Sequence, residues 1–302
     1  MTETVMDPTP MAFFAGVAYC ERAGEALRLD VLAPARGVGD GLLPVAVFFH
    51  GGGWHEGDRG AGMHPWMNPL LATRGYVTVS VTYRLSKRAA WPAQFDDARD
   101  AVGWVVENIA SFGGDPARVG VWGFSAGAHI AAHLALRLPG VVKAASLAAC
   151  PADLRETEVA EADEVRWLLG AAAAGAGAGA GSGAGAGIGA EASAEALAEA
   201  SPITWVTAGA APTLIVHGTD DQIVDFAQGV ALRDALQEVG GPVEFVAIPG
   251  GSHEWADKPS AADAGGATRV GPGAQAQAQT EADPDARGDF GSVTAEFFDR
   301  VL

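Results

Sequence analysis

The stretch VGVWGFSAGAHIAAHLALRL, residues 119–138, decides the fold. It begins with a short apolar run that predicts a buried strand, and residues 126–138 predict a helix that a following Pro-Gly pair ends. Between the two lies the pentapeptide Gly123-Phe-Ser125-Ala-Gly127. A strand, a sharp turn between glycines and a helix, in that order, are typical of a nucleophile elbow, which exposes a serine hydroxyl at the end of a sheet. The helix N-terminus beside the serine would favour a developing negative charge.

A second glycine-rich motif, HGGGW at residues 50–54, directly follows the apolar run at 44–49. An oxyanion hole needs backbone N–H groups close to a substrate carbonyl, and side chains would obstruct that approach. Consecutive glycines at the end of a strand therefore predict a loop that would stabilise an oxyanion next to Ser125.

The rest of the chain alternates strand and helix patterns. Further strands are predicted around 27–31, 76–83, 143–150, 212–216 and 243–248, and further helices over 95–109 and 228–239. Buried strands that alternate with helices indicate an α/β fold with a mostly parallel central sheet flanked by helices. We expect a single domain over residues 1–302.

Two low-complexity segments interrupt this pattern. Residues 171–190 are nearly pure Ala and Gly, and residues 257–288 are rich in Ala, Gly, Gln, Pro and Asp. Neither offers a hydrophobic period from which to build a core, so both are predicted to be insertions without regular structure. The spacing of Glu191, Glu195 and Glu199 after the first insertion fits either a short solvated helix or a continuation of the loop.

An elbow serine needs a histidine base and a carboxylate that orients it, in the chain order serine, acid, histidine. The strand predicted at 212–216 leads to a turn with Asp220 and Asp221. The strand predicted at 243–248 leads to a glycine loop with His253. Because the carboxyl ends of parallel strands share one edge of the sheet, these side chains are expected beside Ser125. The pattern alone leaves Asp220 and Asp221 open as the acid, with Asp225 as a further alternative.

Several longer stretches match a known family. They are HGGGWHEGDR (50–59), YRLS (83–86), WPAQFDDARDAVGWV (91–105), FGGDPARVGVWGFSAGAHIAAHLA (112–135), SPITWV (201–206) and HGTDDQIV (217–224). In these stretches the chain resembles α/β-hydrolases of the esterase and lipase type, including hormone-sensitive-lipase-like and feruloyl- or acetyl-esterase-like enzymes. The resemblance covers most of residues 45–140 and 201–255 and implies the α/β-hydrolase fold.

The resemblance also implies the roles of individual residues. It assigns a nucleophile, a base, an acid and three oxyanion-hole N–H donors, which are Ser125, His253 and Asp221, and Gly52, Gly53 and Ala126. Asp221 is selected over Asp220 because the family places the acid four positions after the histidine of an HGxxD pattern, here His217.

The reaction implied is hydrolysis of a small-molecule carboxylic ester. The serine would attack the carbonyl to form an acyl-enzyme, and the histidine would then activate water to release the acid. This chemistry needs neither a cofactor nor a metal. A short or aromatic acyl group is the first expectation. The alternatives are an aryl formamidase or other amide hydrolase on the same scaffold, and a non-catalytic hydrolase-fold binding protein, which would usually lack a triad member.

Charge and composition limit the partners. The 302 residues include 37 acidic and 19 basic side chains, and the net charge of −18 argues against nucleic acid and anionic membranes. No apolar run is long enough for a spanning helix, and the N-terminus lacks the pattern of a secretory signal. Two cysteines, Cys20 and Cys150, cannot form a disulfide framework, so a reduced, cytoplasmic protein is expected. The sequence makes no prediction of the oligomeric state.

The remaining histidines are predicted to have structural roles. His129 and His133 lie one turn apart on the helix after the elbow, but no third metal ligand accompanies them, so they are expected to pack inside or face solvent. His50 and His217 each separate a strand from a glycine and are expected to hold loops.

Aromatic and acidic residues near these motifs have two interpretations. Trp54, Trp91 and Trp255 fit either the wall of an apolar acyl pocket or the core. A group of aspartates on one predicted helix is expected to form a charged face, with one of them as a possible loop anchor: Asp96, Asp97 and Asp100.

Overall fold

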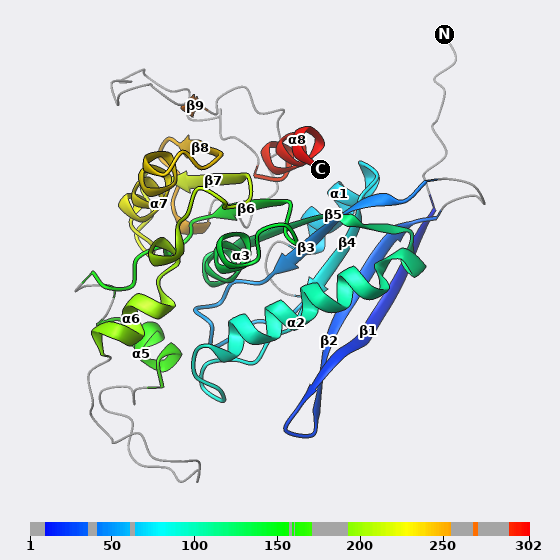
Figure 1. Cartoon of the computed structure of the whole chain (residues 1–302), viewed down its shortest axis with the longest axis horizontal. Coiled ribbons are helices and arrows are strands. Elements are labelled where there is room, and N and C mark those ends of the chain that lie inside the picture. Colours follow the sequence, from blue (N-terminus) through cyan, green and yellow to red (C-terminus); the bar gives the residue numbers. More distant parts are fainter. Residues whose placement is uncertain are drawn as a thin grey trace.

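The structure is a computed structural model in which a twisted sheet lies between two layers of helices (Figure 1). It describes residues 10–35, 41–60, 64–156, 159, 161–170, 193–254, 268–270 and 290–302. The insertion predicted at 171–190 lies outside the described residues. So does the insertion predicted at 257–288, apart from residues 268–270.

The described residues form a nine-stranded sheet in the order β1-β2-β4-β3-β5-β6-β7-β8-β9. The strands from β4 to β8 in that order run parallel, whereas β2 is antiparallel to β1 and β4, and β9 is antiparallel to β8. The bounds are β1 Met11–Arg22, β2 Glu25–Pro34, β3 Leu43–Phe49, β4 Val77–Val81, β5 Gly114–Phe124, β6 Ala144–Ala148, β7 Thr213–Gly218, β8 Val243–Ile248 and β9 Thr268–Val270. The predicted mostly parallel sheet is confirmed.

Helices cover both faces of the sheet. Helices α2, α3 and α7 pack on one face, and α1 and α8 pack on the other (Figure 1). The helices are α1 His64–Thr73, α2 Ala93–Asn108, α3 Ala126–Arg137, α5 Asp163–Leu168, α6 Ala194–Ala200, α7 Phe226–Glu238 and α8 Phe290–Val301, with 3-10 turns η1 Ile109–Phe112 and η2 Pro202–Trp205. The helices predicted over 95–109, 126–138 and 228–239 are present as α2, α3 and α7, and helices flank the sheet as expected.

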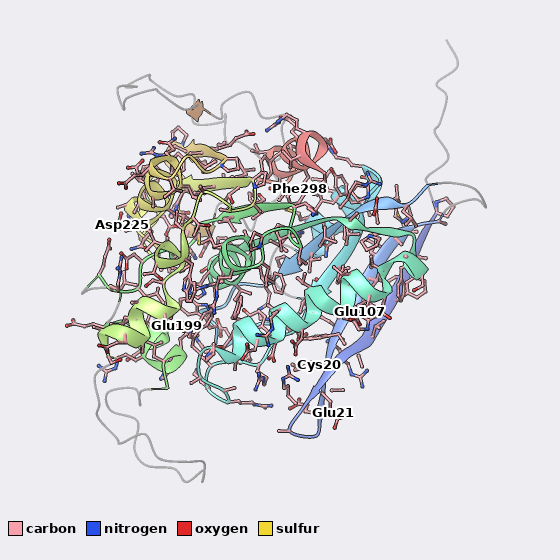
Figure 2. The ribbon with its side chains drawn as sticks, in the orientation of Figure 1. Cys20, Glu21, Glu107, Glu199, Asp225 and Phe298 are labelled. Atoms are coloured by element: carbon pink, nitrogen blue, oxygen red, sulfur yellow. The ribbon has the colours of Figure 1, made fainter. Side chains whose placement is uncertain are left out.

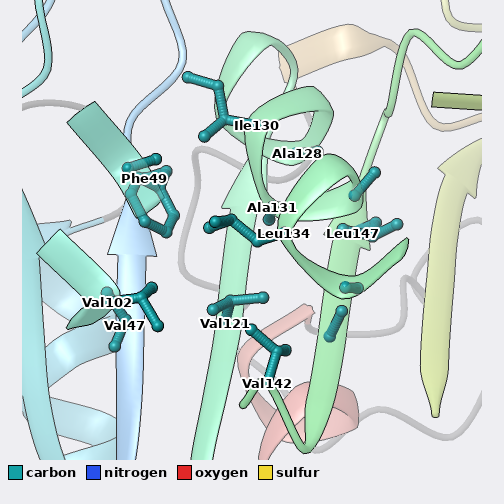
Figure 3. Packing of buried hydrophobic residues seen from close by; sticks show 14 of the residues in the cluster. Val47, Phe49, Val102, Val121, Ala128, Ile130, Ala131, Leu134, Val142 and Leu147 are labelled. Carbon is teal, nitrogen blue, oxygen red and sulfur yellow. The ribbon is translucent and has the colours of Figure 1, made fainter. Parts of the chain in front are cut away.

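The core explains why α3 sits at the centre of one layer. Val121 of β5 and Leu147 of β6 point at Ala131 and Leu134 of α3, and Phe49 of β3 lies beside the same helix (Figure 3). All residues from Ala126 to Leu136 are buried, because small alanines let the helix lie close to the sheet. This packing fixes the start of α3, and with it the turn that carries Ser125.

Several elements differ from the sequence-based expectation; helices α1 and α5, for example, were not predicted. Strand β1 was not predicted, because it lies at the sheet edge with register shifts near Gly16 and Tyr19, and half-exposed residues on both faces hide its alternation. Strand β9 places three residues of the second predicted insertion on the sheet. Helix α6 is a true helix capped by Ser193, and it is not fully solvated, since Leu197 and Ala200 are buried.

Candidate active site

Ser125 occupies a strained turn between β5 and α3. Its φ of 53° and ψ of −122° are unfavourable for a residue with a side chain, and its N–H donates to Ala148 O at 2.9 Å. The flanking glycines allow this turn. A Cβ on Gly127 would lie 2.0 Å from Phe49 O, and a Cβ on Gly123 would lie 2.4 Å from the carbonyl carbon of Gly127. The predicted elbow geometry is present, and it depends on glycine at both positions.

Two further strand ends bring a histidine and a carboxylate to this serine. His253, after β8, has its Nε2 3.2 Å from Ser125 Oγ and its Nδ1 2.8 Å from Asp221 Oδ2. The carboxylate can only accept, so Nδ1 carries the proton and Nε2 is left to accept from the serine hydroxyl. The structure thus joins the three residues proposed as nucleophile, base and acid in one hydrogen-bonded chain.

The surroundings of Asp221 keep its carboxylate ionised. The residue is buried, and its Oδ1 accepts from the N–H groups of Ile223 and Val224, both at 2.9 Å. Burial alone would raise the pKa of this carboxyl, but hydrogen bonds from His217, His253 and the two backbone N–H groups outweigh burial and hold the pKa well below its usual range. Asp221 is therefore a permanent negative charge beneath His253.

The other candidate acids lie elsewhere. Asp220 is exposed and accepts from the hydroxyl of Thr219 at 3.1 Å. Asp225, labelled in Figure 2, caps α7 by accepting from the N–H of Ala227 at 2.7 Å. Of the three aspartates left open by the strand pattern, only Asp221 contacts His253.

The glycine loop after β3 lies against the elbow. A Cβ on Gly51 would be 3.6 Å from Ser125 Cβ, and Gly52 and Gly53 have φ of 109° and 53°. The carbonyl of Gly52 accepts from the N–H groups of the next turn at 3.1 and 3.0 Å. Within the ranges that the structure describes, the N–H groups of Gly52, Gly53 and Ala126 donate to no protein acceptor. Two donors in the glycine loop and one at the start of α3 therefore have no protein acceptor among the described residues.

Two histidines hold the loops of this site, as predicted. His50 stacks on Tyr83 with ring centroids 4.2 Å apart, and the Tyr83 hydroxyl donates to His50 O at 2.8 Å. Burial lowers the pKa of His50 to about 4, so its ring is neutral. His217 Nε2 donates to Val224 O at 2.9 Å and lies 3.4 Å from Asp221 Oδ2, which fixes the turn that carries the acid.

His129 and His133 are completely buried on α3, and neither faces solvent. Their Nε2 atoms lie 2.7 and 3.0 Å from Ala200 O. His129 Nδ1 also accepts from Trp54 Nε1 at 3.2 Å, and Trp54 is itself buried. Trp54 thus belongs to the core, whereas Trp255 lies outside the described residues.

Helix α5, which the sequence reasoning missed, borders the glycine loop. A Cβ on Gly53 would lie 3.0 Å from Glu164 Cγ, so α5 packs against the glycine loop. Trp167 of α5 contacts His55 edge to face at 4.8 Å, and Lys87 Nζ lies 4.1 Å from the Trp167 ring centroid. The helix has six residues, too few to show a clear hydrophobic period. Its tryptophan was the one sign in the sequence that this segment packs against the protein.

Asp97 is the loop anchor that the sequence left as the alternative to a charged helix face. Its side chain is fully buried and accepts from the backbone N–H and the guanidinium of Arg84 at 2.8 to 3.1 Å. The carboxylate is tolerated inside because these charge-assisted bonds satisfy both oxygens. Asp96 and Asp100 are partly exposed and pair with Arg99, as a charged face would. Asp97 instead anchors the segment after β4.

Neither a metal centre nor a membrane span is found in the described ranges. In them, no group of three His, Cys, Asp or Glu side chains is arranged to hold a metal ion. None of the helices built from these residues is both long and apolar enough to cross a bilayer.

The central parallel sheet, the strained serine elbow and the strand-end histidine and aspartate define an α/β-hydrolase fold. Residues 29–236 match the family model described as BD-FAE, and the chain belongs to this family. The resemblance stated from the motifs is thereby confirmed.

Curated relatives with esterase names match most of the chain. Esterase LipQ of Mycobacterium tuberculosis is 30% identical over 230 residues, which are 74% of this chain and 51% of LipQ. The probable carboxylic ester hydrolase LipM of the same organism is 29% identical over 227 residues, which are 70% of this chain and 49% of LipM. The chain therefore spans about half the length of these relatives.

Solved structures share the fold. A truncated carbohydrate esterase from gut microbiota superposes with a TM-score of 0.72 at 20% identity, covering 98% of both chains. An esterase from the Planctomycetes species Thermogutta terrifontis superposes with a TM-score of 0.63 at 25% identity, covering 83% of this chain and 85% of its own. The predicted α/β-hydrolase fold is confirmed.

Proposed function

We propose that this protein is a serine hydrolase of carboxylic esters that works through an acyl-enzyme. One observation carries the proposal, namely the hydrogen-bonded chain from Ser125 Oγ through His253 to Asp221 at 3.2 and 2.8 Å. The esterase names of relatives such as LipQ and LipM support the same reaction class.

The geometry suggests how the first half of the reaction would run. Ser125 Oγ attacks the ester carbonyl while His253 Nε2 accepts the hydroxyl proton. Asp221 keeps the proton on Nδ1 and stabilises the imidazolium that forms. The carbonyl oxygen becomes an oxyanion, and the unpaired N–H groups of Gly52, Gly53 and Ala126 would stabilise it together with the N-terminus of α3.

The proton transfer then reverses, which completes formation of the acyl-enzyme, and water releases the acyl group afterwards. The imidazolium gives its proton to the leaving alkoxide, the C–O bond of the ester breaks, and the acyl group stays on Ser125 as an ester. His253 then takes a proton from water, the resulting hydroxide attacks the acyl carbon, and Ser125 leaves with that proton. The products are one alcohol and one carboxylic acid, and the site returns to its starting state.

Ser125→Ala tests the proposal. Alanine fits where serine did, so the variant should keep the fold and lose on the order of 10⁴ or more in kcat with a p-nitrophenyl ester. Circular dichroism and thermal unfolding check that the variant is folded. A folded variant that retained more than about a tenth of the wild-type rate would exclude Ser125 as the nucleophile.

A further inference from the structure

One buried hydrogen bond links the glycine loop to the helix that presents Ser125. Trp54 Nε1 donates to His129 Nδ1 at 3.2 Å, and the two rings meet edge to face with centroids 5.1 Å apart. Trp54 directly follows Gly53 and has a φ of 60°, a conformation that a tryptophan needs local support to hold. The N–H of His129 donates to Ser125 O at 3.0 Å in the first turn of α3. His129 therefore contacts Trp54, the residue after Gly53, and Ser125, the residue before Ala126.

The surroundings of His129 fix a single tautomer. Its Nε2 lies 2.7 Å from Ala200 O, which can only accept, so the ring proton is on Nε2. This leaves a lone pair on Nδ1 for the indole N–H of Trp54. Burial lowers the pKa of His129 to about 4, and the ring is neutral at pH 7. A charged ring would carry a second N–H that points at the Trp54 donor.

We propose that His129 is a positioning residue, which holds the loop of residues 51–54 against the Ser125 elbow through its hydrogen bond to Trp54. This inference rests on the proposed function, because it concerns the donors of that oxyanion hole. Losing the bond would let the N–H groups of Gly52 and Gly53 drift from the position where the oxyanion forms. Such a change lowers kcat and leaves substrate binding almost unaltered, since the oxyanion exists only in the transition state.

The same aromatic cluster offers a matched control. Trp91 also packs against His129, with centroids 5.1 Å apart, but its Nε1 donates to Glu199 of α6, labelled in Figure 2. Trp54→Phe and Trp91→Phe each remove one indole N–H from a largely buried ring. Only the first removes a bond from the glycine loop.

The first experiment compares the two variants on a p-nitrophenyl ester. Trp54→Phe should lower kcat by about 10- to 100-fold with KM within about twofold, because a small misplacement of oxyanion donors costs that much. It should weaken binding of a trifluoromethyl ketone, which forms an oxyanion on Ser125, by a similar factor. Trp91→Phe should stay within about threefold of wild type in kcat and in inhibitor affinity, since its N–H bond lies away from the loop.

A second pair of variants keeps the inference testable if Trp54→Phe does not fold. His129→Asn retains an acceptor near the Nδ1 position, and His129→Gln retains a donor near the Nε2 position. We expect the Asn variant to keep the higher kcat, even if the Gln variant is the more stable one. Equal kcat for Trp54→Phe and Trp91→Phe, or a higher kcat for His129→Gln than for His129→Asn, would overturn the inference. Wild-type turnover and its loss in Ser125→Ala report separately on the proposed function.

Discussion

His253 and His129 each make two hydrogen bonds through their ring nitrogens close to Ser125, but their surroundings differ. His253 is partly exposed, at 14% of its side chain, and its Nδ1 faces the ionised carboxylate of Asp221. His129 is fully buried between a carbonyl oxygen and an indole N–H, both uncharged. His253 lies against a carboxylate, whereas a second proton on His129 would have no acceptor in the described part of the core. Distance to the serine therefore does not decide which histidine can act as a base.

Among the changes that test this comparison, removing the negative charge beside His253 should cause the largest loss of kcat. Asp221→Asn makes the surroundings of His253 neutral, like those of His129, and no longer enforces its tautomer. We expect the fold to persist and kcat to fall on the order of 10²–10⁴. Steady-state kinetics with a p-nitrophenyl ester measure this change.

Asp220→Asn is the control for that variant. Asp220 is exposed and contacts Thr219 rather than His253, so its loss should cost less than about tenfold in kcat. If Asp220→Asn were the inactive variant, the hydrogen bond between Asp221 and His253 would not be the one that matters in solution.

The free energy of unfolding should fall at low pH, because the buried histidine rings stay neutral in the folded protein. Burial lowers the pKa of His50 and His129 to about 4, and holds that of His133 well below its usual range. Below about pH 6.5 these histidines bind protons in the unfolded chain but not in the folded protein. The free energy of unfolding therefore falls as the pH falls from about 6.5 toward 4. At pH 5 each ring should cost about 2 kcal/mol relative to pH 7.

Urea unfolding at pH 7 and pH 5 measures this loss. The midpoint should drop at pH 5, and it should drop less in His129→Asn, which has one fewer ring to keep neutral. An identical midpoint at both pH values would mean that the buried histidines accept protons without cost, which would contradict this expectation.

The smallest effect, a nearly unchanged melting temperature, is expected when the Ala-Gly segment at residues 171–190 is replaced. Ala200, whose carbonyl holds both buried histidines, lies in the part of the chain that follows residues 171–190. We predict that replacing 171–190 by a short Gly-Ser joint leaves the melting temperature nearly unchanged, because loop-closure cost varies slowly with length. Differential scanning calorimetry measures it, and a fall of more than about 10 °C would mean that the segment supports the His129 site.

The sequence predicted the parts of the site whose signals are local. The elbow at Ser125 and the glycine loop could be read from strand, turn and helix patterns within a few residues. Asp221 needed the family pattern, because the strand before it leads equally to Asp220. The structure separates the two aspartates by burial and by the bonds that Asp221 accepts from the following turn.

Contacts between distant segments could not be predicted in this way. The bond from Trp54 to His129 spans 75 residues, and the anchor of Asp97 depends on Arg84 from another segment. Strand β1 escaped detection for a related reason, since an edge strand with half-exposed faces has no clear alternation. Such features depend on tertiary packing, which local periodicity does not encode.

Trapping the acyl group tests the central claim most directly. Wild-type protein mixed briefly with p-nitrophenyl acetate and quenched in acid should gain the mass of one acetyl group, and peptide mapping should locate it on Ser125. The same treatment of Ser125→Ala should leave the mass unchanged. Ester hydrolysis with the acetyl group on another residue, or hydrolysis that persists in Ser125→Ala, would contradict the account.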